Sequence, residues 1–218
     1  MKRALFLGLG ALIGGVALAP AALLLPAPPL AAARVSGSVW NAELAGASIG
    51  PLLLGDVSLA LDPGALLHGR LGWRIGGGIT GQIWRGFAAG GAAGLNGRLA
   101  GSPLASLPLA GVTLGDASAT LDGAGRCTAA SGNVVADLAV PLAGQRQLMG
   151  APRCDGDALL LPLASSDGRV RAELTTTRGH WSARIVISGA GSGEAAALIA
   201  SGFRGQAGAL VRQETGSW

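Results

Sequence analysis

The chain has 218 residues, which is enough for one domain or for one domain and an appendage. Half of the residues are hydrophobic and 13% are charged, but large rings are limited to five Trp and three Phe beside 38 Gly. This composition favours an aliphatic sheet face over a thick globular core, because large buried side chains contribute most to core stability. The formal net charge of +4 comes from scattered Arg residues, so the high pI does not indicate nucleic-acid binding.

The N-terminal segment is uncharged and apolar after Lys2 and Arg3. Residues 4–25 exceed the roughly 20 residues that a helix needs to span the hydrocarbon core of a membrane. These residues can span the membrane as one helix if Pro20 kinks the helix rather than ending it. We therefore expect a retained signal-anchor, with residues 1–3 as a short cytoplasmic tail.

A cleaved signal peptide is the alternative reading of the same segment. Its apolar region would be 4–19, with a small-residue cleavage site at 31–33. In both readings everything after Arg34 is exported. We expect 26–34 to be a Pro/Ala linker and 35–218 to form a β-rich periplasmic domain.

The exported part is divided by Gly, Pro, Asn and Asp into runs of strand length, which is typical of an antiparallel all-β unit. In the run at 169–176, for example, polar and apolar residues alternate with the period of a strand. One run at 192–203 has helical periodicity, with Ser192 as the expected N-cap. The predicted strands are 35–40, 52–61, 69–75, 79–89, 94–101, 112–121, 133–140, 158–163, 169–176 and 180–188.

These elements predict a mainly β fold. We expect a curved antiparallel β-sheet with one apolar face and a short C-terminal helix, following the N-terminal transmembrane helix. The many glycines inside the strands permit bends and bulges, which curve a sheet. A closed sandwich is the alternative.

Two short phrases occur twice. LGDVSLALD at 54–62 returns as LGDASATLD at 114–122, and GSVW at 37–40 returns as GQIW at 81–84. In the first pair the Asp follows Gly and begins an alternating strand. A turn that leads into a half-exposed strand explains this phrase without any catalytic role.

Cys127 and Cys154 are the only cysteines, and both lie in the exported part. In an oxidising compartment such a pair indicates a disulfide, which would contribute about 3–4 kcal/mol. Two unpaired buried thiols are the alternative. A metal site is disfavoured because neither Cys has a Cys or His nearby in sequence.

Residues suited to catalysis are scattered. His68 and His180 have no neighbouring carboxylate or Cys, and no Ser lies in a Gly-x-Ser-x-Gly frame. Asp155 and Asp157 lack the remaining ligands of a calcium loop. The Gly-rich stretch 75–81 lacks the Lys and the following helix of a phosphate loop. We expect no catalytic residue, metal, cofactor or small-molecule substrate.

The tryptophans are the candidate contact residues on the apolar face. Trp40 and Trp84 end strands that look equivalent, while Trp73 and Trp181 lie in alternating runs. We expect Trp40 and Trp84 to be buried on the sheet face. The alternative is an apolar groove that presents Trp to a lipid or to a partner strand.

Several segments together resemble protein N of the type II secretion system. They are the basic start with its single apolar segment, VSGSVWNAELAGASIG, LGDVSLALDPGALLHGRLGWRI, LMGAPRCDGDALLLPLAS with its Gly-x-Pro-x-Cys, and AAALIASGF. The resemblance implies a single-pass inner-membrane protein that contacts other secretion components and is not an enzyme. It also implies that Cys154 is one partner of the disulfide.

Three functions of different classes follow. The first is an interaction protein of the secretion machinery, anchored in inner-membrane lipid and binding partners by strand addition or face packing. The second is a lipid-shielding protein, because a curved sheet with an apolar face also resembles AsmA-like envelope proteins. The third is an exported hydrolase that uses His68 or His180.

Overall fold

The computed structural model describes residues 30–38, 40–49, 52–100, 108–139 and 147–217. The expected anchor at 4–25 lies outside these residues. None of the helices in the described ranges is long and apolar enough to cross a membrane.

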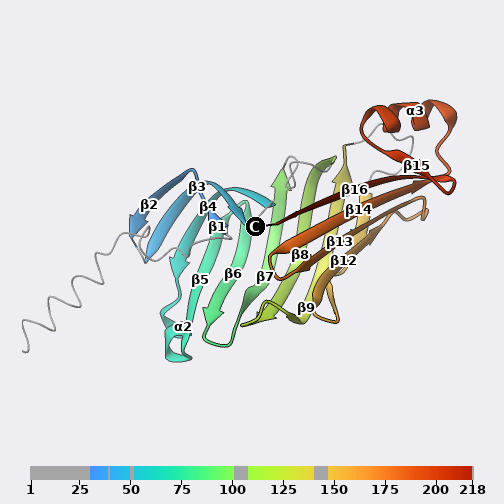
Figure 1. Ribbon diagram of the computed structural model, residues 1–218. Helices are drawn as coiled ribbons and strands as arrows, with labels where there is room; N and C mark the ends of the chain where they lie inside the picture. Colours follow the sequence, from blue (N-terminus) through green and yellow to red (C-terminus); the bar gives the residue numbers. More distant parts are fainter. Residues whose placement is uncertain (1–29, 39, 50–51, 101–107, 140–146, 218) are drawn as a thin grey trace, which may run out of the picture.

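The described chain forms one 16-stranded antiparallel sheet with two short helices, α2 and α3 (Figure 1). The strands follow in the order β1-β3-β4-β5-β6-β7-β8-β9-β10-β12-β13-β14-β16-β15, and β2 and β11 pair beside β3 and β12. The first elements are β1 (Leu30–Ala31), β2 (Arg34–Ser38), β3 (Asn41–Ile49), β4 (Leu52–Leu61), α2 (Pro63–Leu67), β5 (Arg70–Gly77), β6 (Ile79–Gly86), β7 (Ala89–Ala100), β8 (Leu109–Asp122) and β9 (Cys127–Leu138). They are followed by β10 (Gln147–Gly150), β11 (Arg153–Asp155), β12 (Ala158–Ala164), β13 (Val170–Thr177), β14 (His180–Ser188), α3 (Ser192–Ala200), β15 (Arg204–Gln206) and β16 (Ala209–Ser217).

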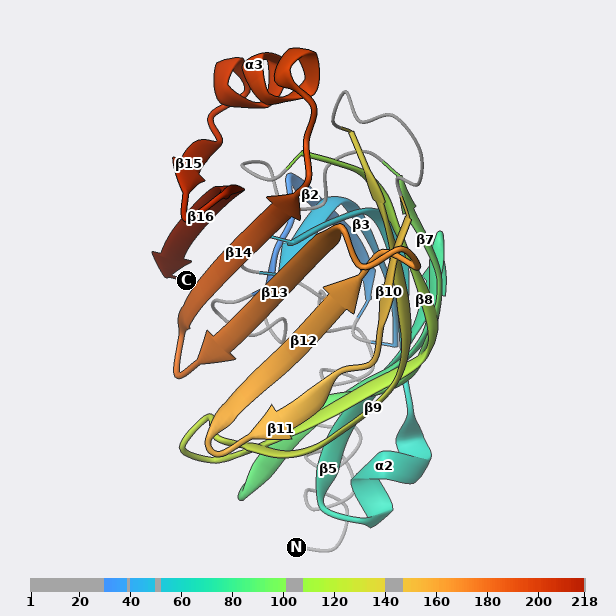
Figure 2. The same cartoon turned by 90° about the vertical axis from the view of Figure 1, so that its right-hand side faces the viewer.

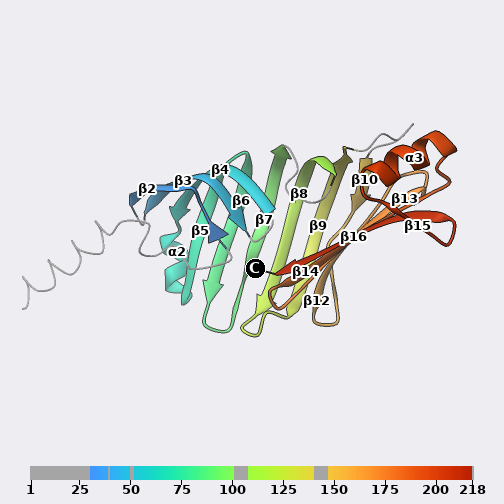
Figure 3. The same ribbon diagram turned by 45° about the horizontal axis from the view of Figure 1, so that its top comes forward.

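The sheet curls around its apolar face. Leu109 of β8 and Leu210 of β16 belong to one buried cluster, although five strands separate β8 from β16 in the sheet. Two such distant strands share a core only if the sheet bends toward that face. Figures 2 and 3 show the resulting trough, with β12–β16 facing back toward β3 and β4. The curved open sheet agrees with the prediction, and the sandwich alternative, which needs two sheets, is wrong.

The apolar face packs into two cores. The C-terminal core comprises residues of β8–β10, β13, β14, β16 and α3, with Ile185, Ile187 and Leu198 at 2% exposure or less. The N-terminal core comprises residues of β3, β4 and β5, among them Leu44, Leu59 and Trp73. This arrangement follows from the alternation in the sequence, which places apolar side chains on one face along much of these strands.

The repeated Gly-Asp phrase marks two β-bulges. The register shifts within residues 44–48 of the β3–β4 pairing and within residues 92–97 of the β7–β8 pairing. Each bulge holds a glycine with positive φ, Gly46 at 60° and Gly94 at 59°. The backbone N–H of Gly46 donates to Asp56 Oδ1 at 2.9 Å, and that of Gly94 donates to Ser118 Oγ at 3.0 Å. Both copies of the phrase therefore serve the same structural purpose, to hold a bend in the sheet.

The predicted strands at 52–61 and 180–188 coincide with β4 and β14. The predicted helix is α3, but its N-cap is Gly191 and not Ser192. The Glu194 carboxylate accepts the backbone N–H of Gly191 at 3.2 Å, so the acidic residue rather than the Ser secures this end. The prediction omitted six strands, β1, β3, β10, β11, β15 and β16, and the helix α2.

Candidate interaction surfaces

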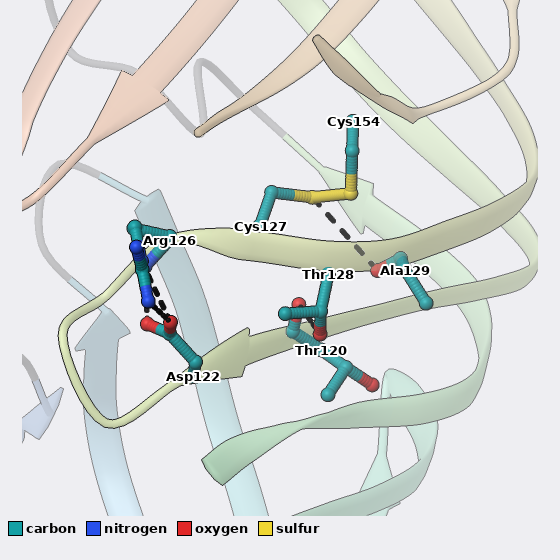
Figure 4. The surroundings of a disulfide bond; sticks show 7 residues. All are labelled: Thr120, Asp122, Arg126, Cys127, Thr128, Ala129 and Cys154. Carbon is teal, nitrogen blue, oxygen red and sulfur yellow. Dashed lines mark hydrogen bonds and ion pairs between the residues drawn. A yellow bond between two sulfur atoms is a disulfide. The ribbon is translucent and has the colours of Figure 1, made fainter. Parts of the chain in front are cut away.

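A disulfide joins Cys127 and Cys154, as predicted, with a Cα–Cα distance of 5.4 Å. Cys127 begins β9 and Cys154 is the centre of β11 (Figure 4). The bond crosses a seam in the sheet. Further along the seam, β10 pairs with residues 134–137 of β9 but with β12 at one position only. Because so few ladder pairs join the two halves of the sheet, the disulfide fastens them at the Cys127 end of β9.

Polar contacts reinforce the same seam. The backbone N–H of Cys127 donates across the seam to the carbonyl of Asp157 at 2.9 Å. On the far side of the seam, the Asp157 carboxylate forms an ion pair with Arg178 of the β13–β14 turn, also at 2.9 Å. In the neighbouring turn the backbone N–H of Arg126 lowers the pKa of the Asp122 carboxyl, and the Arg126 side chain adds to this effect (Figure 4). The seam is thus crossed by a covalent bond and by one backbone hydrogen bond, and the turn that precedes Cys127 is ordered by Asp122 and Arg126.

One edge of the sheet is incompletely covered. β15 pairs with β16 only through Ala209, Leu210 and Val211. Within the part of the chain that the structure describes, residues 212–217 of β16 have a strand partner on one side only, namely β14. We call 212–217 the open edge. Its Gln213, Thr215 and Ser217 are exposed.

The start of the open edge contacts the end of α3. Arg212 donates from Nη1 to the carbonyl of Ser201 at 2.7 Å, directly after α3, and forms an ion pair with Glu214 at 3.2 Å. Leu198 and Phe203 anchor this part of the chain in the C-terminal core. Arg212 therefore links the start of the open edge to the end of α3, and the rest of the edge is held by its pairing with β14.

A shallow hollow of about 470 Å³ runs along the beginning of the open edge. Its wall includes Arg204 and Gln206 of β15 and Arg212, Gln213 and Glu214 of β16. The hollow lies beside the pair of Arg204 and Val211, where β15 begins, and beyond it the backbone of β16 has no second strand partner among the described residues. An added strand would meet polar side chains of both charges at this point.

The four candidate tryptophans lie on different surfaces. Trp73 is buried in the N-terminal core, and Trp181 packs at the margin of the C-terminal core over Gly216. Trp40 is 42% exposed in the turn between β2 and β3, so its expected burial is wrong. Trp84 lies within β6 and not at a strand end, and it is half-buried beneath the guanidinium of Arg70, 4.6 Å from the ring centroid. The structure does not bring the four rings together into one groove.

The two histidines are far apart in the sheet. His68 caps the end of α2, with Nδ1 3.0 Å from the carbonyl of Gly64, and His180 begins β14 opposite Thr177. Both are exposed. Among the described residues no three His, Cys, Asp or Glu side chains are grouped as metal ligands would be. Asp155 and Asp157 flank the β11–β12 turn, where Asp157 serves the ion pair with Arg178.

Comparison with known proteins gives one match. The family model described as type II secretion system (T2SS), protein N, matches residues 28–211. No curated protein and no solved structure matches the chain.

Proposed function

The chain belongs to the type II secretion system protein N family, and on that premise we propose that it is a non-enzymatic inner-membrane component of the secretion machinery. The match carries this proposal because it extends from before β1 into β16 and so includes nearly the whole sheet. The apolar segment at 4–25 supports a single-pass anchor with a cytoplasmic N-terminus. The disulfide supports a periplasmic sheet, since such bonds persist in oxidising compartments.

Contact with another secretion component would take place at the open edge. An exposed strand offers unpaired backbone N–H and C=O groups, to which an extended segment adds as a further strand. Residues 212–217 provide such a row of backbone groups. They pair with β14 on their other side, and Arg212 is bonded to the carbonyl of Ser201. Backbone pairing would supply affinity, and the side chains of Gln213 and Thr215 would supply selectivity.

The lipid-shielding alternative receives less support. A protein that shields acyl chains needs an apolar face that is free to receive them. Here the apolar face packs against itself, with Leu44, Leu148 and Ile185 at 2% exposure or less. We therefore favour a protein contact as the main role of the sheet.

The structure offers a matched pair of positions for a test. Thr175, Ser182 and Thr215 form one row across β13, β14 and β16, because Thr175 pairs with Ser182 and Ser182 pairs with Thr215. A photoreactive amino acid at Thr215 reports on the open edge. The same amino acid at Thr175 reports on an interior strand of the same face.

We expect crosslinks in intact cells to a protein of the secretion machinery from Thr215 and not from Thr175. Equal adducts at both positions, or none at Thr215, would refute strand addition at this edge. Extraction of membranes at alkaline pH tests the anchor. The full chain should stay with the membrane, and protease added to spheroplasts should digest the sheet.

A further inference from the structure

One end of the sheet carries five of the eight exposed large hydrophobic side chains among the described residues. We call these five the apolar tip: Trp40 (42% exposed), Leu66 (43%), Leu67 (88%), Leu71 (43%) and Phe87 (102%). They come from the β2–β3 turn, from α2, from the start of β5 and from the β6–β7 turn. These segments share one end because the carbonyl of Trp40 accepts the N–H of Leu61, just before α2, and because Arg70 pairs with Gly86, just before Phe87. Figure 1 shows α2 and the β6–β7 turn at this end.

The packing of α2 and the position of the β6–β7 turn direct side chains of the apolar tip away from the sheet. In α2 the small residue faces the sheet, since a Cβ placed on Gly72 would lie 2.8 Å from the Cβ of Ala65. Leu67 consequently points away from the sheet, the reverse of an ordinary surface helix. Phe87 lies in the two-residue turn between β6 and β7, where nothing covers its ring. Both side chains project as separate knobs and do not line a groove.

Positive charge lies beside these knobs. Arg70 stacks on Trp84, and Arg85 lies opposite Leu71 in the β5–β6 ladder. Within the described residues neither Arg has an ion-pair partner. The acidic residue that adjoins α2, Asp62, accepts the backbone N–H of Gly64 at 3.0 Å and so caps the helix.

We propose that the apolar tip inserts into the surface of a bilayer that contains anionic phospholipid. Projecting Leu and Phe side chains suit a fluid phase that closes around each of them, whereas a rigid protein partner would need a matching pit for each. Trp favours the interface between water and hydrocarbon, and Arg70 and Arg85 would meet lipid phosphates. A second copy of the chain is a poorer partner, because tip-to-tip contact would bring like charges together.

The expected anchor is compatible with this contact. β1 is joined to β3 by only two residue pairs, at the end of β3 away from the apolar tip. If both β1 and the 3.0 Å hydrogen bond from the Ala33 N–H to the carbonyl of Ala45 are released, residues 26–33 of the expected linker can span up to about 26 Å when extended. β2 runs from Arg34 toward the tip and ends at Ser38, about 13 Å further on. Anchor and tip could then touch the same bilayer.

The test uses the full chain reconstituted into vesicles of phosphatidylcholine with or without phosphatidylglycerol. A photoreactive amino acid replaces Leu67 or Phe87 in turn. Leu53, which is 50% exposed near the other end of β4, serves as the matched control. We expect phospholipid adducts at Leu67 and Phe87 well above those at Leu53, and more of them when phosphatidylglycerol is present. With the probe at Phe87, Arg70→Gln and Arg85→Gln should each lower the yield about fivefold in anionic vesicles.

Equal lipid yields at Leu53 and Phe87, or adducts with protein alone, would overturn the proposal. So would yields that do not depend on phosphatidylglycerol. Because Thr215 reports on the open edge at the far end of the strand order, its crosslinks to secretion proteins would persist if the lipid contact failed. The two proposals can therefore fail separately.

Discussion

Removal of the disulfide tests whether the seam between β9 and β12 is held chiefly by a covalent bond. Two variants are compared. The single variant carries Cys154→Ala, and the double variant carries both Cys127→Ala and Cys154→Ala. Closing a loop across a sequence separation of 27 residues restricts the unfolded chain, and loop-closure entropy puts the loss of stability at about 3.5 kcal/mol at 25 °C. Such a loss is large, because whole domains are stable by only about 5–15 kcal/mol.

The assay is urea unfolding of the full chain in mild detergent, followed by Trp fluorescence. Trp73 and Trp181 report on the two cores, since each packs against one of them. The single and the double variant should lose the same free energy of unfolding, because either one removes the bond completely. Reduced wild-type protein should match them. In hydrogen exchange, the backbone amides of 153–155 should lose protection before those of β14, whose neighbours on both sides are intact.

Two results would refute this reasoning. A loss below about 1 kcal/mol would mean that the reduced chain remains restricted in its unfolded state. A double variant much less stable than the single variant would mean that packing of the Cys127 side chain, which is 7% exposed, matters more than the cross-link.

Three further predictions concern a glycine, an ion pair and a helix contact. Gly97→Ala should lower the free energy of unfolding by about 2 kcal/mol or more, because φ is 137° and the new Cβ would collide with the carbonyl of Gly78. Gly205→Ala, with open space around it, should change little in the same urea titration. Because the pKa of Asp122 is lowered in the folded protein, the ionised carboxylate stabilises the fold at pH values above the ordinary carboxyl pKa, near 3.9. This stabilisation is lost as the pH falls through the lowered pKa. Asp122→Asn should therefore reduce the loss of stability on acid titration. Arg212→Met should speed hydrogen exchange in α3 by removing the bond to the Ser201 carbonyl.

The sequence predicted the strands whose alternation is regular. In β4, Val57, Leu59 and Leu61 are buried while Asp56 and Ser58 are exposed, as the period of two requires. β13 and β14 were found in the same way. Curvature toward the apolar face also followed, because glycine-rich strands allow bulges. The disulfide was predicted from the number of cysteines and from the expectation that this part of the chain is exported.

The omitted elements have physical reasons. β3 was missed because Gly46 and the register shift beside it break its alternation, so that Leu44 and Ala47 are both buried. α2 was not predicted, although Asp62 followed by Pro63 is a regular helix start and the Asp62 carboxylate does accept the Gly64 N–H. The exposed Trp40 was missed because a sequence does not say which end of a sheet is left uncovered.

The chemistry of the open edge decides what kind of partner it can take. β15 covers β16 where the apolar Leu210 and Val211 would otherwise lie at an unpaired edge. The pairing with β15 stops at Val211, after which the sequence of β16 becomes polar. Arg212 and Glu214 lie on one face of β16, and Gln213 and Thr215 lie on the other. Charged residues and a polar face discourage indiscriminate strand pairing. A partner that adds here must therefore satisfy polar side chains on both faces, so its selectivity would come from hydrogen bonds and charge and not from buried apolar area.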